Sequence, residues 1–269
     1  MEKKSRRAFL KESSAAALGL SWGGSLLATA CTGEAGGQGH GEASVEGQLA
    51  MVIDMEKAGN PAVRAACREA CNRAHNIPHL PDQDEEINWI WDEEYQHVFP
   101  DQVHDHTPEE LRESPILVLC NQCTNPPCVR VCPTQATWKR ESDGIVMMDM
   151  HRCIGCRYCM AACPYGSRSF NWRDPRPFVE TDSEGNFLSD FPTRTRGVVE
   201  KCNFCAERVR DGLPPACVEA ADQVPGGEGA LVFGDLSDPN STVSRILEEG
   251  PTMARRVGLG TGPNVFYIV

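Results

Sequence analysis

The chain carries two closely spaced cysteine runs, CNQCTNPPCVRVCP at 120–133 and CIGCRYCMAACP at 153–164. The second run has the spacing Cys-x2-Cys-x2-Cys-x3-Cys-Pro, and the first is the same run with two extra residues before its third cysteine. Disulfides within such short runs would be strained. Zinc explains isolated Cys-x2-Cys pairs, but not two four-cysteine runs that each end in proline. The spacing is instead typical of ligands to cubane iron–sulfur clusters.

Two adjacent runs of this kind predict two clusters that exchange their fourth ligands. Three cysteines on one tight loop hold one cluster, and the fourth cysteine, which we expect to open a helix, reaches back to the neighbouring cluster. The exchange predicts two [4Fe-4S] ligand sets: Cys120, Cys123, Cys128 and Cys163 for one, and Cys153, Cys156, Cys159 and Cys132 for the other.

Two incomplete runs flank this intact pair. Alanine stands at position 221, where a fourth cysteine would follow Cys217, and Arg64 stands where a ligand would precede Cys67. If these runs also exchange ligands, a third [4Fe-4S] cluster has a complete set in Cys71, Cys202, Cys205 and Cys217. A fourth cluster would need Ala58 or a neighbour, Arg64, Cys67 and Ala221. Three of those four ligands are missing, so the sequence predicts three clusters and leaves Cys67 as a small buried residue.

The rest of the chain predicts short elements joined by long loops. It has 269 residues, 24 of them glycine and 19 proline, and only 41% are hydrophobic. We expect an α+β fold over residues 50–269, made of two pseudo-repeated ferredoxin-like modules with long loops and a C-terminal extension. The intact pair would span about 115–170, and the degenerate pair would use about 50–80 and 198–235. Expected strands lie at 51–54, 116–119, 145–148, 231–233 and 265–269, and a helix follows Asn60-Pro61.

The N-terminus reads as an export signal. Residues 5–11 (SRRAFLK) match the twin-arginine pattern, which predicts a signal peptide over 1–30, a flexible linker over 31–49 and a periplasmic location. Simple cleavage is favoured over lipidation of Cys31. Without residues 1–30, which carry five Lys/Arg and two Asp/Glu, the net charge falls from −12 to about −15. Such an acidic chain is a poor nucleic-acid binder. Past the signal no stretch is long and apolar enough to span a membrane, so membrane attachment would come through partners.

The later motifs carry a family resemblance. They resemble the four-cluster electron-transfer subunits of dimethyl-sulfoxide and polysulfide reductases, at 201–205 (KCNFC), 215–217 (PAC), 229–231 (GAL) and 233–235 (FGD). Further stretches at 88–91, 138–140 and 166–170 are similar to the periplasmic O subunit of the transmembrane complex associated with dissimilatory sulfite reduction. The resemblance implies a sulfur-metabolism complex with two partners, a quinone-interacting integral membrane subunit and a periplasmic multihaem cytochrome c. Arg64 and Ala221 depart from the four-cluster pattern.

Electron relay without a substrate-converting site is the predicted function. The chain offers no nucleophile–base constellation, phosphate-binding loop or dinucleotide fingerprint. Two alternatives stay open: an electron-transfer subunit of a molybdopterin oxidoreductase, and a free polyferredoxin.

Several residues beside the cysteines allow two interpretations. Arg152, Arg157 and Lys201 either raise cluster potentials or are solvated surface charges. His75 fits a packed or surface histidine better than a tuning residue. Core or interface packing is favoured over an electron path for Trp89, Trp91, Trp138 and Trp172.

Overall fold

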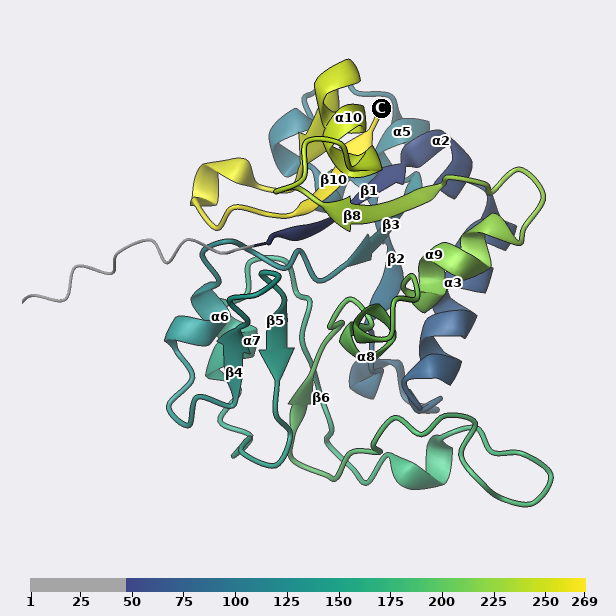
Figure 1. Ribbon diagram of the computed structural model, residues 1–269, viewed down its shortest axis with the longest axis vertical. Coiled ribbons are helices and arrows are strands. Elements are labelled where there is room, and N and C mark those ends of the chain that lie inside the picture. Colours follow the sequence, from purple (N-terminus) through teal and green to yellow (C-terminus); the bar gives the residue numbers. More distant parts are fainter. Residues whose placement is uncertain (1–46) are drawn as a thin grey trace, which may run out of the picture. The chain divides into compact units, whose positions relative to one another are not determined.

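The computed structural model describes residues 47–269 (Figure 1), so the predicted signal peptide and Cys31 lie outside the described residues, with most of the predicted linker. Among residues 47–269, no helix has both the length and the apolar character needed to cross a bilayer. Short helices, strands and 3₁₀ turns alternate along this part of the chain, as expected for an α+β class rich in loops.

A four-stranded sheet brings the two ends of the described chain together. Its strand order is β8-β1-β10-β9, with β1 antiparallel to β8 and parallel to β10. On β1, Met51 and Ile53 face the main core, while Ala50 and Val52 face a smaller cluster under helix α10. Both faces of β1 are therefore buried, which explains its continuous apolar run. The strands are β1 (Leu49–Asp54), β8 (Leu231–Asp235), β9 (Thr252–Ala254) and β10 (Val265–Ile268), and α10 spans Thr242–Glu249.

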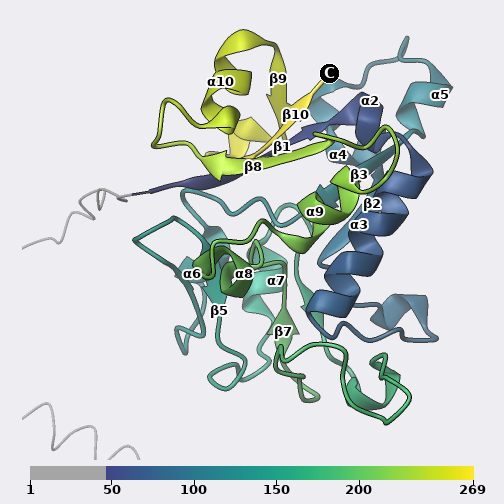
Figure 2. The ribbon, with the colours of Figure 1, turned by 45° about the vertical axis from the view of Figure 1, so that its right-hand side comes forward.

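Helix α3 (Pro61–Ala74) is the longest described helix, and it begins where the sequence predicts. The Asn60 side chain accepts a hydrogen bond from the Ala62 amide at 2.9 Å, and Pro61 occupies the first turn. Figures 1 and 2 show α3 lying beside α9 (Ala216–Asp222). This contact joins the two regions that hold the incomplete cysteine runs.

Three two-stranded ladders complete the sheet structure. They pair β2 (Ile90–Glu94) with β3 (Pro115–Leu119), β4 (Thr137–Lys139) with β5 (Val146–Met148), and β6 (Ser169–Phe170) with β7 (Val199–Glu200). The strands predicted at 51–54, 116–119, 145–148, 231–233 and 265–269 are thus present, within a residue or two of their expected bounds. The remaining elements are α2 (Met55–Ala58), α4 (Tyr95–Val98), α5 (Glu109–Arg112), α6 (Pro127–Arg130), α7 (Tyr158–Ala162), α8 (Ala206–Arg210) and 3₁₀ turns at 83–85, 100–102, 176–178 and 257–259.

One local prediction is wrong. The fourth cysteine of each intact run does not open a helix but follows one: Cys132 comes just after α6, and Cys163 caps the C-terminus of α7. The reason is the proline after each of them, because a residue that precedes proline is pushed out of the helical region. It is the third cysteine of each run that lies inside a helix.

Candidate cluster-binding sites

The cysteines form no disulfides among residues 47–269, where all thirteen are free. Most are buried, and all except Cys67 belong to three groups in the loops and helices. We call these groups the first, second and third sites.

The first site is a small enclosed cavity whose surface is almost wholly apolar. Cys120 enters it directly after β3, Cys128 from α6, and Cys163 from the end of α7. The four cysteines of the first predicted set all line it: Cys120, Cys123, Cys128 and Cys163. Burial, followed by the neighbouring Cys120 and Cys128, raises the pKa of the Cys123 thiol to about 12. Several thiolates in so dry a place need positive charge beside them.

The second site lies at the loop before α7 and is more exposed. Cys153 is a close neighbour of the buried Cys159, whose pKa is raised first by burial and then, in part, by Cys153. Cys156 is exposed on the same loop, and Cys132 follows α6, which packs against α7. Burial raises the pKa of Cys132, but hydrogen bonds from Thr134, Ala136 and Thr137 outweigh it and lower the pKa below its ordinary value.

The third site lies deep in the protein and joins distant segments. Cys71 comes from α3, Cys217 from α9, and Cys202 and Cys205 from the turn between β7 and α8. Burial raises the pKa of Cys71 strongly, and Cys205, Cys202 and Cys217 add to this increase. The structure therefore brings together all four residues of the third predicted set, each of them buried.

Packed side chains fill the position of the predicted incomplete set. The buried Arg64 guanidinium donates through Nη1 to the carbonyl oxygen of Ala58 at 3.1 Å, and its Nε lies 3.3 Å from Asp92 Oδ2. Cys67 donates its S–H to the Cys217 carbonyl at 3.3 Å, and burial raises its pKa to about 12. Ala221 is fully buried in the α3–α9 contact.

Gly227, in the loop after α9, packs against both helices of that contact. A Cβ added there would lie 2.4 Å from the Ala221 carbonyl oxygen on α9 and 2.8 Å from a Val63 methyl group on α3. A side chain at this position would therefore clash with both helices.

The three sites follow one another. Burial is the main cause that raises the pKa of Cys202 in the third site, and Cys120 of the first site is close enough to raise it as well. Arg168 lies between the first and second sites: it lines the first cavity with Cys128, and it is close enough to Cys159 of the second site to oppose the rise in the pKa of that thiol caused by burial. No spacing in the sequence marks Arg168 as a candidate functional residue. Its only sequence signal is its place in the stretch 166–170, and the family resemblance of that stretch implies no role for it.

The structure distinguishes the buried Lys201 from the exposed Arg152 and Arg157. Lys201 is buried and donates through Nζ to the carbonyl groups of Val146 and Cys202, which places a cation between the first and third sites. Arg152 is exposed and paired with Asp149 at 3.3 Å. Arg157 is also exposed, and its guanidinium stacks 4.6 Å from the Trp172 ring centre.

His75 is a packed histidine beside the third site. Its ring lies 4.4 Å from Trp89, its Nδ1 is 3.0 Å from the carbonyl oxygen of Cys71, and its Nε2 is 2.7 Å from Glu207 Oε1. Burial raises the pKa of Glu207, but the His75 hydrogen bond and charge outweigh burial and lower the pKa. Of the tryptophans, Trp89 belongs to the core and Trp91 packs against it, whereas Trp138 and Trp172 are exposed.

Comparison with known proteins identifies the chain's relatives. Residues 116–176 match the model of the 4Fe-4S dicluster domain. The chain is 41% identical over 235 residues to the Hdr-like menaquinol oxidoreductase iron-sulfur subunit 1 of Archaeoglobus fulgidus, covering 81% of this chain and 82% of that one. It is 36% identical over 239 residues to the menaquinone reductase iron-sulfur cluster-binding subunit of Nitratidesulfovibrio vulgaris, covering 81% and 87%. It is 34% identical over 253 residues to the arsenate respiratory reductase iron-sulfur subunit of a Shewanella species, covering 82% and 96%.

These likenesses extend far beyond the intact cysteine pair, because each covers more than four fifths of this chain. The matched domain and the cysteine sites described above both imply 4Fe-4S clusters. The chain therefore belongs to the family of iron–sulfur electron-transfer subunits of respiratory menaquinol, dimethyl-sulfoxide and polysulfide-type reductase complexes.

Proposed function

We propose that the chain binds three [4Fe-4S] clusters and relays electrons between partner subunits. Each bound cluster would supply a one-electron couple. The ligands would be Cys120, Cys123, Cys128 and Cys163 at the first site, Cys153, Cys156, Cys159 and Cys132 at the second, and Cys71, Cys202, Cys205 and Cys217 at the third.

The observation that carries this proposal is the direction of the hydrogen bonds around the sulfurs. The amide of Val199 donates to Cys153 Sγ at 3.5 Å, that of Phe204 to Cys202 Sγ at 3.4 Å, and that of Ala216 to Cys205 Sγ at 3.4 Å. At the first site, burial raises the pKa of Cys163, and the backbone amides of Tyr165 and Ser167 offset part of this rise. Donors aimed at sulfur favour the thiolate, which is the form that binds iron, and they also tune the potential of a bound cluster.

The filled position at Arg64 is what supports three clusters over four. A cluster there would have Cys67 as its one cysteine ligand, and the Arg64–Asp92 pair and the α3–α9 contact occupy the space around it. A guanidinium has no lone pair to offer to iron. The packed Arg64–Asp92 pair thus takes the place in the core that a fourth cluster would fill.

We further propose that the subunit acts on the periplasmic side within a sulfur-metabolism complex of the sulfite-reduction-associated type. Its partners would be a quinone-interacting integral membrane subunit and a periplasmic multihaem cytochrome c. The twin-arginine pattern at 5–11 supports export. Two of its relatives are named as iron-sulfur subunits of a menaquinol oxidoreductase and a menaquinone reductase, which supports the quinone link.

A second candidate is the electron-transfer subunit of a molybdopterin oxidoreductase, favoured by the 34% identity to the arsenate reductase subunit. Affinity capture of the tagged chain from detergent-solubilised membranes of its native host separates the two. The proposed complex predicts c-type haem absorbance and an integral membrane protein in the captured material. Molybdenum without haem would favour the second candidate, and recovery of the chain alone from the soluble fraction would favour a free polyferredoxin.

A further inference from the structure

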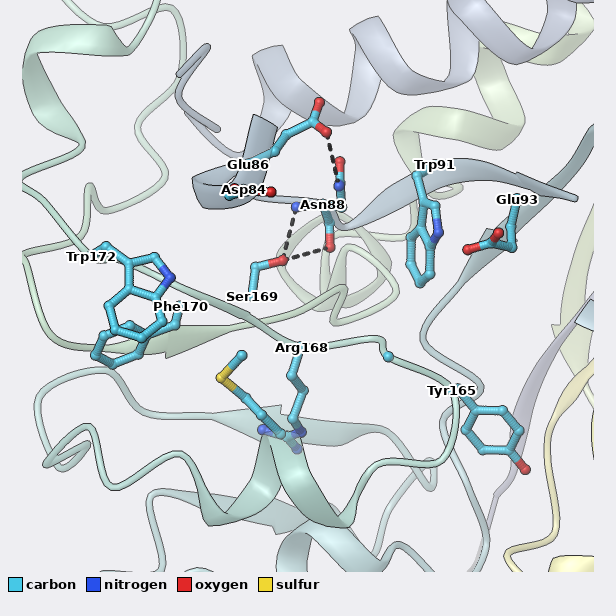
Figure 3. A pocket seen from close by; sticks show the side chains of 12 residues that line it. Asp84, Glu86, Asn88, Trp91, Glu93, Tyr165, Arg168, Ser169, Phe170 and Trp172 are labelled. Carbon is cyan, nitrogen blue, oxygen red and sulfur yellow. Dashed lines mark hydrogen bonds between the residues drawn. The ribbon is translucent and has the colours of Figure 1, made fainter. Parts of the chain in front are cut away.

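Arg168 is a buried cation between two groups of cysteines. It lies just before β6, only 5% of its surface is exposed, and its side chain lines the cavity of the first site. Figure 3 shows the side chain directed away from Asn88 and Ser169. Its Nη2 donates to Thr137 Oγ1 at 3.0 Å, and its Nη1 lies 3.8 Å from the sulfur of Met148. Cys128 lines the same cavity and packs with Cys159, and both thiols lie close enough to the guanidinium to act on it electrostatically.

The two thiols belong to different ligand sets. Cys128 is one of the four cysteines of the first site, and Cys159 is one of the four of the second. A single planar guanidinium with several fixed donors can approach both at once, which the single ammonium group of lysine cannot do in the same geometry. Arg168 is therefore placed to act on both sites together.

Within residues 47–269, no carboxylate forms an ion pair with Arg168. Arg194, which is also deeply buried, differs in this respect, because its Nη2 lies 2.6 Å from Glu200 Oε2 and both side chains are fully buried. Burying a charge without an opposite charge is strongly unfavourable. Burial lowers the pKa of Arg168, yet Cys128, Cys159 and Cys120 together raise it above its ordinary value. With clusters bound, the thiolate sulfurs of the two sites would supply the negative charge that no carboxylate provides.

We propose that Arg168 is a positioning residue that stabilises the reduced form of the clusters at the first and second sites, and so raises both midpoint potentials. The inference rests on the proposed cluster-binding function. Reduction adds an electron to an already anionic thiolate-bound cluster, and a buried positive charge beside the sulfurs offsets that added charge more strongly than an exposed one. Because the third site lies on the far side of the first, its potential is expected to change least.

The test compares three variants of the full chain, each reconstituted anaerobically and checked for iron before a redox titration followed by electron paramagnetic resonance. Arg168→Gln is expected to lower two of the three midpoint potentials by about 59 mV, which is a tenfold change in the ratio of reduced to oxidised cluster for a one-electron couple. Arg168→Lys keeps the charge but not the paired donors, so it is expected to lower the same two potentials by less. Arg152→Gln removes the same charge from an exposed position beside Cys153, and all three potentials should stay at the wild-type values.

Different results separate this inference from the function on which it rests. Unchanged midpoint potentials in an Arg168→Gln chain with wild-type iron content would overturn the role of Arg168 and leave the three-cluster function intact. A wild-type chain that binds no iron would overturn the function itself. If Arg168→Gln loses its clusters, Arg168→Lys decides the matter, because two unchanged potentials in that variant would also overturn the inference.

Discussion

The first site and the α3–α9 contact around Cys67 both contain cysteines of a cluster-binding pattern. Four thiols line an enclosed cavity at the first site, whereas packed side chains surround Cys67 at the contact. The space that the four thiols line is apolar. At the α3–α9 contact one thiol, Cys67, remains, and the Arg64–Asp92 pair and Ala221 pack around it. At the contact, packed side chains stand where the pattern would need further ligands, and an unfilled buried space there would destabilise the fold.

The largest expected difference between the two regions is in iron content. Cys217→Ala should remove one cluster, about four iron atoms per chain, because it deletes a ligand of the third site. Cys67→Ala changes a thiol only one contact away, since Cys67 donates to the Cys217 carbonyl, yet it should keep wild-type iron. Iron and acid-labile sulfide assays on both purified variants measure this. Equal iron loss in the two variants would mean that Cys67 is a ligand.

Exposure predicts which cluster is lost first. Cys156 is exposed and Cys132 and Cys153 are half-buried, whereas all four cysteines of the third site are buried. Mild oxidation with a chelator present should therefore release the cluster of the second site before the others. Cysteine alkylation mapped by mass spectrometry should then label Cys156 and Cys132 first.

The pKa directions sharpen the same experiment. Since hydrogen bonds lower the pKa of Cys132 despite burial, its thiolate persists to lower pH than that of an ordinary cysteine, and its labelling should extend to lower pH as well. Burial raises the pKa of Cys71 well above the usual value, so its labelling should need higher pH or unfolding. Early labelling of the third site would contradict this order.

A smaller effect is expected from the ion pair that fills the α3–α9 region. Arg64→Ala should reduce stability by about 2–3 kcal/mol, because it leaves a cavity and an unpaired Ala58 carbonyl beside Asp92. Denaturant-induced loss of the cluster absorbance measures the change under anaerobic conditions. Arg73→Ala is the matched control on the same helix: its exposed pair with Glu69 should contribute less than about 0.5 kcal/mol. Similar losses in the two variants would show that the Arg64 pair does not stabilise this region.

Much of the fold near the sites could be predicted from local signals. The Asn60-Pro61 cap located α3, and the short apolar runs located β1, β3, β5 and β8, because caps and buried strands leave marks in adjacent residues. The three predicted cysteine sets were found from spacing and pairing alone, and the structure gathers the first and third sets completely. Whether these cysteines hold three clusters stays a prediction.

What could not be predicted depends on contacts between distant segments. Arg168 lies near Cys128, Thr137 and Cys159, which come from three other segments. The spacing of residues along the sequence therefore does not predict its position between the sites. From the sequence, Arg64 is only a missing ligand, because its ion-pair partner Asp92 lies in β2, distant in the sequence. The position of the short helices was misjudged at Cys132 and Cys163, where proline ends the helix before the cysteine.

Iron and acid-labile sulfide per chain, measured on anaerobically purified or reconstituted protein together with electron paramagnetic resonance of the reduced form, test the central claim most directly. The account predicts about twelve of each, for three [4Fe-4S] clusters. About sixteen would contradict the account, because a fourth cluster would then have to displace the Arg64–Asp92 pair. About eight would contradict it in the other direction and would leave Cys71, Cys202, Cys205 and Cys217 without a cluster.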